Sequence, residues 1–286
     1  MDGALFQSSA PAAFVALMYH NVIADDKSCS DLSPSATSYF VDQAAFAEQL
    51  ARIADCGASC MDLDALRRFY HSDRPAVSAA SGGPHILLTF DDGWRDGVEI
   101  GGPVLERYRA QAILFVTTEF LGRPYFLTAG EVSRIDPKLF RIGSHACTHR
   151  MLSLLGEDEI RAELSDSRKM LEDITGYEVN TLSIPSGAVD GRVRRIALEC
   201  GYKFLFDSEV KVNRRGDNPM AIGRVAVMRH TGLDAFSRYI EQRIGPERFR
   251  RAILQAPKRL MGLRRYERMR RRLLGEKPTQ QVTHTS

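Results

Sequence analysis

Short apolar runs alternate along the chain with longer segments in which apolar residues recur every third or fourth position. The apolar runs have the length of strands, and they are Phe14–Tyr19, Ile86–Phe90, Ala112–Thr117, Phe140–Ser144, Thr181–Ile184, Lys203–Phe206 and Ala221–Met228. The periodic segments predict helices at Gln43–Ala54, Trp94–Arg109, Glu157–Thr175, Gly191–Cys200 and Leu233–Ile244. Because strands alternate with helices, the pattern predicts an α/β fold with a largely parallel sheet, either open or closed into a barrel.

Local signals mark where several of these elements begin and end. Asp42 is placed to cap the amino end of the first helix, and Gly176 and Gly201 are placed to stop the third and fourth. Residues 21–41 and 71–84 are rich in Ser, Asp, Gly and Pro, which predicts surface loops in both places.

Composition and cysteine usage are those of an ordinary soluble protein. The 286 residues are 44% hydrophobic and 26% charged, which suits one large α/β domain or two smaller ones. The five cysteines are odd in number and scattered, so we expect free thiols and a reducing compartment. No basic stretch precedes an apolar segment at the start, and no apolar run has the length of a membrane span, so we expect a cytoplasmic protein.

Polar side chains follow several of the predicted strands. They are His20, Asp91, Asp92, His145 and Asp207, with His149 four residues after His145. The carboxyl ends of parallel strands share one edge of a sheet, so we expect these groups to converge there. Simpler alternatives exist for each group: a DDG turn for the aspartates, a strand-end cap for His20 and a turn cap for Asp207.

The sequence GSHACTH has the spacing of a metal-binding histidine pair. Its H-x3-H pattern, His145 and His149, predicts two imidazoles on one face of a helical turn. Two histidines and one carboxylate supply three ligands for zinc or a similar ion and leave a position for water, as in catalytic sites. The pair alone is a weak signal, and the adjacent aspartates at a strand end strengthen it.

Two of these stretches resemble a known enzyme family. LLTFDDG (87–93) and RIGSHACTH (141–149) resemble the first two signature motifs of the polysaccharide deacetylases, the NodB-homology domain of carbohydrate esterase family 4. LMYHNV (17–22) resembles the branch that includes the exopolysaccharide poly-N-acetylglucosamine deacetylases. The resemblance implies a distorted (β/α)7-type, NodB-like barrel over residues 1–244, and metal-dependent removal of an N-acetyl group from an amino sugar.

The resemblance also implies a role for each matching residue. Asp92, His145 and His149 become the metal ligands, and Asp91 becomes the general base. The expected ion is Zn²⁺, with Co²⁺, Ni²⁺ or Mn²⁺ as alternatives. The metal would polarise the acetamide carbonyl and activate its bound water, while Asp91 takes the proton. The backbone N–H of Ser186 would stabilise the oxyanion that forms.

The third and fifth motifs of the family are not fully matched. LSIPSG (182–187) has no Arg to orient Asp91, so we predict that Arg224 takes this place; a surface ion pair of Arg224 is the alternative. No leucine-x-histidine motif supplies the general acid that must protonate the leaving amine. His20 is the first candidate for this acid and His230 the second, with a solvated loop histidine as the alternative for His230.

The C-terminal tail, residues 245–286, differs in charge from the rest of the chain. Residues 247–272 contain eleven Lys or Arg and two Glu, a net charge of +9, and the remainder carries −6. After Pro257 a helical projection separates Leu, Tyr and Met from Arg, which predicts that residues 247–274 contact an anionic membrane surface. A solvated helix packed on the barrel and another partner are alternatives. Nucleic acid is disfavoured, since no aromatic interleaving accompanies the charge.

Together these features predict a metal-dependent amidohydrolase that deacetylates an amino sugar. The sugar would belong to a polysaccharide, or to a lipid- or nucleotide-linked intermediate of cell-surface glycan synthesis met at the inner membrane face. Two alternatives remain open. The first is a sugar N-deformylase or another amide deacylase, and the second is a catalytically silent saccharide-binding domain.

Overall fold

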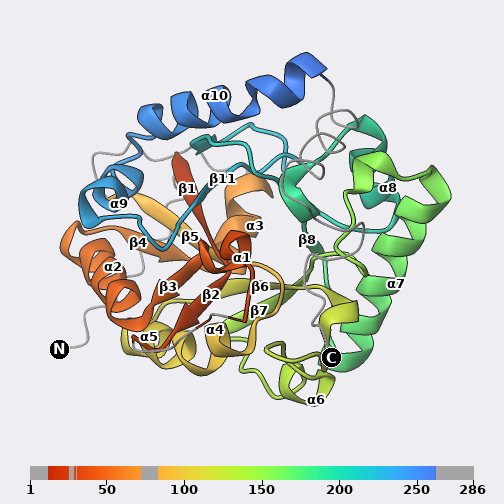
Figure 1. Ribbon diagram of the computed structural model, residues 1–286, viewed down its shortest axis with the longest axis horizontal. Coiled ribbons are helices and arrows are strands. Elements are labelled where there is room, and N and C mark those ends of the chain that lie inside the picture. The colour runs from red at the N-terminus through yellow and green to blue at the C-terminus, as the bar shows by residue number, and fades with distance from the viewer. Residues whose placement is uncertain (1–11, 26–28, 30, 72–82, 262–286) are drawn as a thin grey trace.

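Nine strands form one curled sheet in the computed structural model (Figure 1). The structure describes residues 12–25, 29, 31–71 and 83–261, with side chains as far as Ile253. The strand order is β10-β1-β5-β6-β7-β8-β9, with β11 beside β1 and β4 beside β5. The strands are β1 (Ala13–Tyr19), β4 (Ser59–Met61), β5 (His85–Phe90), β6 (Ala112–Val116), β7 (Phe140–Ser144), β8 (Thr181–Ser183), β9 (Phe204–Phe206), β10 (Asn213–Arg214) and β11 (Arg224–Ala226). Every pairing is parallel except that of β1 with β10, so the predicted parallel α/β fold is confirmed.

The sheet curls toward closure as a half-barrel with helices around it (Figure 1). A parallel bridge joins Phe206, at the end of β9, to Ile222. The chain then enters β11, which pairs with β1. A separate two-stranded parallel sheet, β2 (Asn21–Ile23) with β3 (Phe40–Asp42), adjoins the end of β1 in sequence. The carboxyl ends of β1, β5 and β7 therefore open on a common edge.

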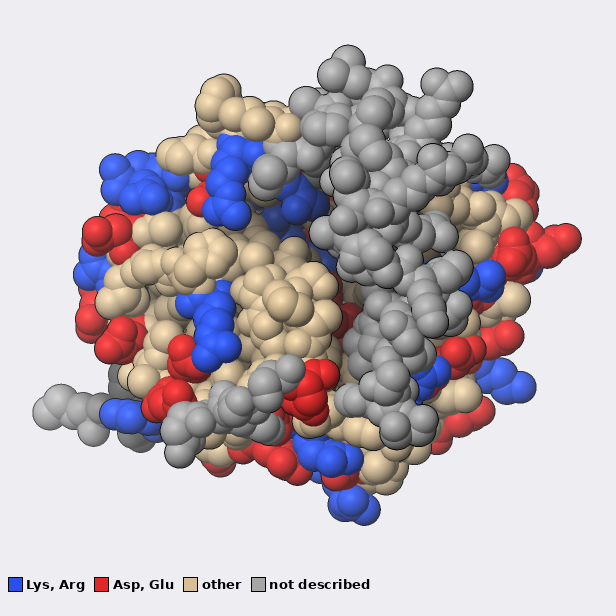
Figure 2. Space-filling view, viewed as in Figure 1, with Lys and Arg blue, Asp and Glu red and all other residues tan. Residues whose placement is uncertain are grey.

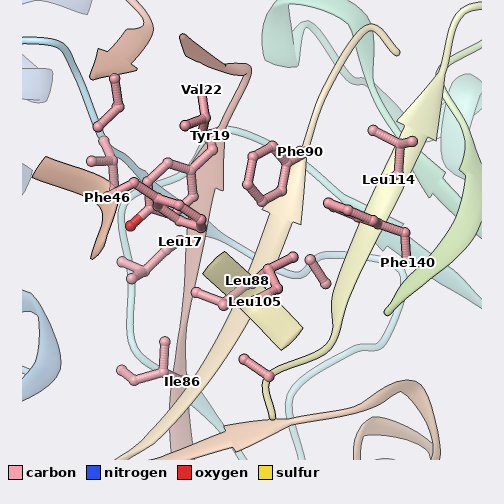
Figure 3. Packing of buried hydrophobic residues seen from close by; sticks show 14 of the residues in the cluster. Leu17, Tyr19, Val22, Phe46, Ile86, Leu88, Phe90, Leu105, Leu114 and Phe140 are labelled. Atoms are coloured by element: carbon pink, nitrogen blue, oxygen red, sulfur yellow. The ribbon is translucent and has the colours of Figure 1, made fainter. Parts of the chain in front are cut away.

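The central strands are mostly apolar because both faces of the sheet are covered. All five residues of β6 are buried, as are the last five of β5. Leu17, Leu88, Phe46, Phe90 and Phe140 belong to the main core cluster, in which Phe90 packs between Phe46, from the first long helix, and Phe140 (Figure 3). Truncation of a core residue of this kind to Ala typically costs about 2–5 kcal/mol, so the strand ends rest on a rigid base.

The helices surround the sheet. They are α1 (Pro34–Thr37), α2 (Gln43–Asp55), α3 (Leu63–His71), α4 (Arg95–Glu99), α5 (Gly101–Arg107), α6 (Ala129–Val132), α7 (Glu157–Thr175), α8 (Gly191–Glu199), α9 (Leu233–Ile240) and α10 (Gly245–Met261). The predicted stop at Gly176 is confirmed: this glycine has φ of 73° and donates its N–H to the Glu172 carbonyl. Glycine adopts this left-handed backbone conformation readily because it has no Cβ.

One predicted helix is divided in the structure. The segment Trp94–Arg109 forms α4 and α5, which meet at Ile100. Pro103 has no N–H to donate to the carbonyl of Glu99, so the regular ladder is interrupted at this turn. The prediction of a single helix here was wrong because it followed the apolar periodicity and overlooked the Gly-Gly-Pro sequence.

The predicted loop at residues 21–41 was also wrong, since it contains β2, α1 and the start of β3. These elements are only three or four residues long, too short to show a period. The same reason explains why β4 and β10 were missed. Asp42 precedes α2 as predicted, yet its side chain makes no capping hydrogen bond and instead pairs with Arg229 at 3.2 Å.

Some predictions fall partly beyond the described chain. Most of the predicted loop at 71–84 and the tail from residue 262 onward lie outside the described residues. The tail's first part forms α10. None of the five cysteines forms a disulfide, as expected. No helix in the described part of the chain is both long and apolar enough to cross a membrane.

Candidate active site

The candidate site lies where the parallel strands end. Asp91 and Asp92 follow β5, His145 follows β7, and His20 follows β1. The backbone N–H of Asp91 donates to the carbonyl of Tyr19 at 3.0 Å, so the end of β1 stays paired to the first aspartate. The convergence that the sequence predicts for these four side chains is therefore present.

Asp92, His145 and His149 form a three-residue cluster with the donor set of a metal site. The Nε2 atoms of both histidines lie 3.4 Å from Oδ1 of Asp92, and all three donor atoms lie within 4.8 Å of one another. Oδ1 of Asp92 is buried and has no hydrogen-bond partner among the described residues, while Oδ2 accepts from the indole N–H of Trp94 at 3.1 Å. A buried carboxylate oxygen without a donor is costly unless a cation neutralises it.

The tautomer of His145 suits metal binding. Its Nδ1 lies 2.8 Å from the carbonyl oxygen of Ser183, and a carbonyl can only accept, so Nδ1 carries the proton. The lone pair of the neutral ring then lies on Nε2, which faces Asp92. A backbone carbonyl on the far nitrogen is a common means of orienting a histidine ligand.

The two histidines meet through a loop rather than a helical turn, so that part of the prediction was wrong. Residues 145–150 have no helical assignment, and Ala146 and His149 have positive φ of 62° and 61°. The buried carboxylate of Glu163 on α7 braces this loop, accepting the backbone N–H groups of Cys147 and Thr148 at 2.9 Å each. Sequence reasoning missed Glu163, although an acidic residue between the buried Ile160 and Leu164 of one helix was a usable signal.

Arg224 clamps Asp91 in the interior. Its Nη1 lies 2.7 Å from Oδ1 of Asp91 and its Nη2 lies 2.8 Å from Oδ2. Arg224 is 1% exposed and Asp91 2%, so the alternative of a surface ion pair does not fit. Nη2 of Arg224 also donates to Ser183 Oγ at 2.8 Å, and that hydroxyl donates to Asp91 at 3.1 Å. Ser183 is a second residue that the sequence did not reveal, and it links Asp91 to His145 through its own carbonyl.

The electrostatics of the site favour two ionised aspartates with different partners. Burial would raise the pKa of Asp91, but the Arg224 guanidinium outweighs it and holds that pKa below its ordinary value. Burial would likewise raise the pKa of Asp92, but the positive charge that His145 and His149 carry when protonated brings it well below its ordinary value. Each carboxylate is therefore charged near neutral pH. Burial would lower the pKa of His145, but the two aspartates raise it, so binding of a metal at Nε2 would release a proton.

The two candidate acids lie in different surroundings. The ring of His20 packs 4.3 Å from that of Tyr39, and its Nδ1 is buried with no hydrogen-bond partner in the described chain. Burial lowers the pKa of His20 despite the nearby Asp92 and Asp91. His230 is exposed in the turn after β11, and among the described residues no hydrogen bond or ion pair connects it to the site.

Ser186 lies in the turn after β8. It is exposed, follows Pro185 and has a positive φ of 59°. The seven non-glycine residues with positive φ in the described chain include Asp92, Ala146 and His149 of the metal cluster and its loop, and Ser186. Backbone in this region is strained for residues with a Cβ and concentrates at functional sites, where the surrounding structure holds it.

Asp207 supports the site from outside it. Its carbonyl accepts from Arg224 Nε at 3.2 Å, and its carboxylate accepts from the Glu209 N–H at 2.9 Å and from Arg194 at 3.2 Å. The turn-capping alternative for Asp207 is thus present in the structure. Its backbone, rather than its carboxylate, connects it to the Arg224–Asp91 pair.

Comparison with known sequences identifies a family segment. Residues 78–205 match the family described as polysaccharide deacetylase. The YxkH protein of Bacillus subtilis is 28% identical over 156 residues, which cover 54% of this chain and 56% of that protein. The peptidoglycan-N-acetylglucosamine deacetylase PgdA of Listeria monocytogenes is 32% identical over 132 residues, covering 46% of this chain and 27% of PgdA. The matches thus span about half of the first relative and about a quarter of the second.

Comparison with solved structures supports the fold. The deacetylase PplD of Streptococcus pyogenes, solved with acetate, aligns with a TM-score of 0.68 at 20% identity, covering 80% of this chain and 99% of that one. IcaB from Ammonifex degensii aligns with a TM-score of 0.68 at 22% identity, covering 80% of this chain and 97% of that one. The expected NodB-like fold, predicted as a distorted (β/α)7-type barrel, is therefore confirmed, and the sheet forms a half-barrel.

Proposed function

The chain carries a polysaccharide deacetylase family segment over residues 78–205, and from this premise we propose that it is a metal-dependent N-deacetylase of an amino sugar. One observation carries the proposal. A cluster of two histidines and one aspartate lies directly beside a second aspartate that is held by an arginine. A hydrolase that attacks an amide with water needs both a cation and a base at one place.

The residues present fit a divalent metal ion. Asp92, His145 and His149 offer one carboxylate oxygen and two imidazole nitrogens, a set that suits Zn²⁺ and also binds Co²⁺, Ni²⁺ or Mn²⁺. The orphaned Oδ1 of Asp92 and the fixed tautomer of His145 support this assignment. When bound there, such an ion supplies Lewis-acid polarisation of the amide and a water of lowered pKa.

Asp91 serves as the general base in this proposal. Arg224 fixes both of its oxygens and keeps the carboxylate ionised, ready to accept a proton from the attacking water. Asp92 has a φ of 77°, and its Oδ1 lies 3.4 Å from Nε2 of both histidines. Asp91 lies farther from His145, at 4.0 Å, and both of its oxygens are held by Arg224. These different main partners support separate roles for the two adjacent aspartates.

The remaining roles belong to Ser186 and His20. The Ser186 N–H is our candidate donor to the oxyanion, and the rigid left-handed turn after Pro185 supports it by fixing the direction of that N–H. His20 is our candidate acid for the leaving amine. Since burial lowers its pKa, His20 starts neutral near pH 7. To act as the acid it must first receive the proton that Asp91 removes from the attacking water, and it then passes that proton to the leaving amine. The proton that Asp91 takes from water balances the one that the amine requires.

The substrate that we propose is an N-acetylated saccharide of a cell-surface glycan, as a polymer or as a lipid- or nucleotide-linked intermediate. The names of two relatives support a saccharide: PgdA is a peptidoglycan-N-acetylglucosamine deacetylase, and a chitin deacetylase of Cryptococcus neoformans is 31% identical over 115 residues. Those names describe the relatives, and the fraction of each relative that this chain covers is small.

An acetate-release assay tests the proposal. Purified protein, reconstituted with Zn²⁺ after chelation, is given a panel of N-acetylated and N-formylated saccharides. We expect acetate from at least one amino sugar, none from the chelated protein, and none from Asp91→Asn. Formate without acetate would indicate a deformylase, and metal-loaded protein that binds saccharide without releasing either acid would indicate the binding domain.

A further inference from the structure

The helix α10 presents a pair of large apolar side chains to solvent. Phe249 is 71% exposed and Ile253 is 56% exposed, the two highest values among the large hydrophobic residues of the described chain. They are four residues apart in a regular helix, so they lie one above the other on the same face. Single exposed apolar residues are common, but an adjacent pair on one helix face forms a continuous apolar strip.

The orientation of this helix is set by contacts on its other side. Ile244, just before α10, is buried in the main core cluster. Glu247 in the first turn is hydrogen-bonded to Tyr239 of α9 and pairs with Arg250 at 3.7 Å. Glu247 and Phe249 are separated by two residues, or about 200° around the helix. Attachment through Glu247 therefore directs Phe249 and Ile253 outward.

Arginines flank the apolar strip on both sides. Arg248 and Arg250 are exposed and immediately neighbour Phe249, and a rotation of about 100° per residue puts one on each side of it. Figure 1 shows α10 along an outer edge of the molecule, and Figure 2 shows Lys and Arg over the same edge among uncharged side chains. Six further arginines and one Glu follow in the sequence between residues 262 and 272.

We propose that α10 docks this protein on an anionic lipid bilayer. Phe249 and Ile253 enter the boundary between head groups and acyl chains, and Arg248 and Arg250 contact lipid phosphates. An exposed apolar strip with basic flanks has the two properties that bind a helix in the plane of such a membrane. The charge distribution agrees, because residues 247–272 carry +9 while the remainder carries −6 and is repelled by the same surface.

Two other occupants fit this surface less well. A symmetric contact with a second copy through the apolar strip would bring Arg248 and Arg250 of both copies together, and their like charges would repel. The phosphates of a nucleic acid would pair with the arginines, but Phe249 and Ile253 would remain exposed to solvent. An anionic bilayer accepts both kinds of side chain, the apolar pair among the acyl chains and the arginines at the lipid phosphates.

Vesicle cosedimentation of the full chain tests the proposal. The vesicles are phosphatidylcholine alone or phosphatidylcholine mixed with phosphatidylglycerol. We expect binding to the anionic vesicles only, and at least ~10-fold weaker binding for Phe249→Ser with Ile253→Ser, since an interfacial Phe and Ile each contribute several-fold to partitioning. The matched control is Met170→Ser with Leu198→Ser, which are 47% and 55% exposed on α7 and α8 and should bind as the unmodified chain does.

A second arm removes charge instead of apolar surface. Arg248→Gln with Arg250→Gln should weaken binding several-fold and reduce its sensitivity to salt, whereas Arg134→Gln, an exposed arginine elsewhere, should not. Circular dichroism shows whether each variant is folded. The proposal is overturned if the apolar variant binds anionic vesicles as well as the unmodified chain, or if neutral vesicles bind equally well. It is also overturned if the strip mediates self-association without vesicle binding, or if only DNA binds.

Membrane docking and catalysis can fail separately. Phe249 and Ile253 have no part in the proposed chemistry, so acetate release from a soluble substrate should be equal in the unmodified chain and in the apolar variant. Loss of vesicle binding with retained acetate release would refute nothing in the deacetylase proposal. Retained vesicle binding without acetate release would leave the docking proposal in place.

Discussion

Replacement of Arg224 by Lys tests how Asp91 is held. The Arg224 guanidinium makes five hydrogen bonds, two to Asp91 and one each to Thr89, Ser183 and Asp207. Lys keeps the charge but has three donors on one nitrogen, so it cannot bridge both carboxylate oxygens and serve the other acceptors. At least two buried acceptors lose their donors at roughly 1 kcal/mol each, so we expect a stability loss of about 2–3 kcal/mol and a kcat lower by ~10–100-fold.

Replacement by Met removes the charge and leaves Asp91 alone in the interior. Breaking a buried ion pair by removing one partner typically costs about 3–5 kcal/mol. In the unmodified chain the pKa of Asp91 is below its ordinary value, so its ionised form adds stability above about pH 4, which is lost as pH falls through the folded pKa. In Arg224→Met burial acts unopposed and raises that pKa, so the ionised form destabilises the fold as pH rises. The acid limb of kcat/KM therefore moves to higher pH.

The assay combines urea unfolding with initial rates across pH. Adding Asp91→Asn to Arg224→Met removes the uncompensated charge, so the double variant should recover part of the lost free energy of unfolding. Asp91→Asn alone serves as the control for the lost hydrogen bonds. The reasoning is refuted if Arg224→Met keeps the acid limb of the unmodified enzyme and Asp91→Asn restores none of its stability.

Three further tests separate the parts of the site, the last of them with two substitutions. Glu163 accepts the two loop N–H groups on one oxygen, and the Thr148 hydroxyl and Arg150 on the other, so in Glu163→Gln one of these two sets of donors faces an amide NH2. We expect metal affinity ~10–100-fold weaker by chelator competition, with activity recovered at excess metal. Unchanged affinity would contradict the bracing role. Trp94→Phe removes the indole N–H that donates to Asp92, so calorimetric titration should show metal binding weakened by ~10-fold. Equal metal affinity would mean that this hydrogen bond does not support the metal site. His20→Gln should lower kcat by ~10²–10⁴-fold with metal content unchanged, while His230→Gln should leave kcat unchanged. The reverse pattern would make His230 the general acid.

The strands and the polar groups at their ends could be predicted because both depend on local sequence. A buried parallel strand must be apolar throughout, so β5 and β6 are visible as runs. Parallel strands also bring their carboxyl ends to one edge, which places Asp91, Asp92 and His145 together before any coordinate is known. No tertiary information is needed for either step.

Glu163 and Ser183 could not be predicted as supports of the site because they act through contacts between distant segments. Arg224 is predictable only because the resemblance leaves Asp91 without its usual Arg, since no local pattern joins two residues that are 133 positions apart. Glu163 lies on the inner face of α7, where its partners are backbone N–H groups of a loop that carries no marker of this contact. The backbone angles of Ala146 and His149 likewise depend on that brace, so the spacing alone suggested a helical turn.

The central claim is that Asp92 is a ligand of the metal and that Asp91 accepts the proton of the attacking water. Metal content and acetate release measured together on purified Asp91→Asn and Asp92→Asn test this claim most directly. The account predicts that Asp91→Asn keeps its metal and releases no acetate, and that Asp92→Asn loses metal and activity together. An active Asp91→Asn, or one that has lost its metal while Asp92→Asn keeps it, would contradict the account.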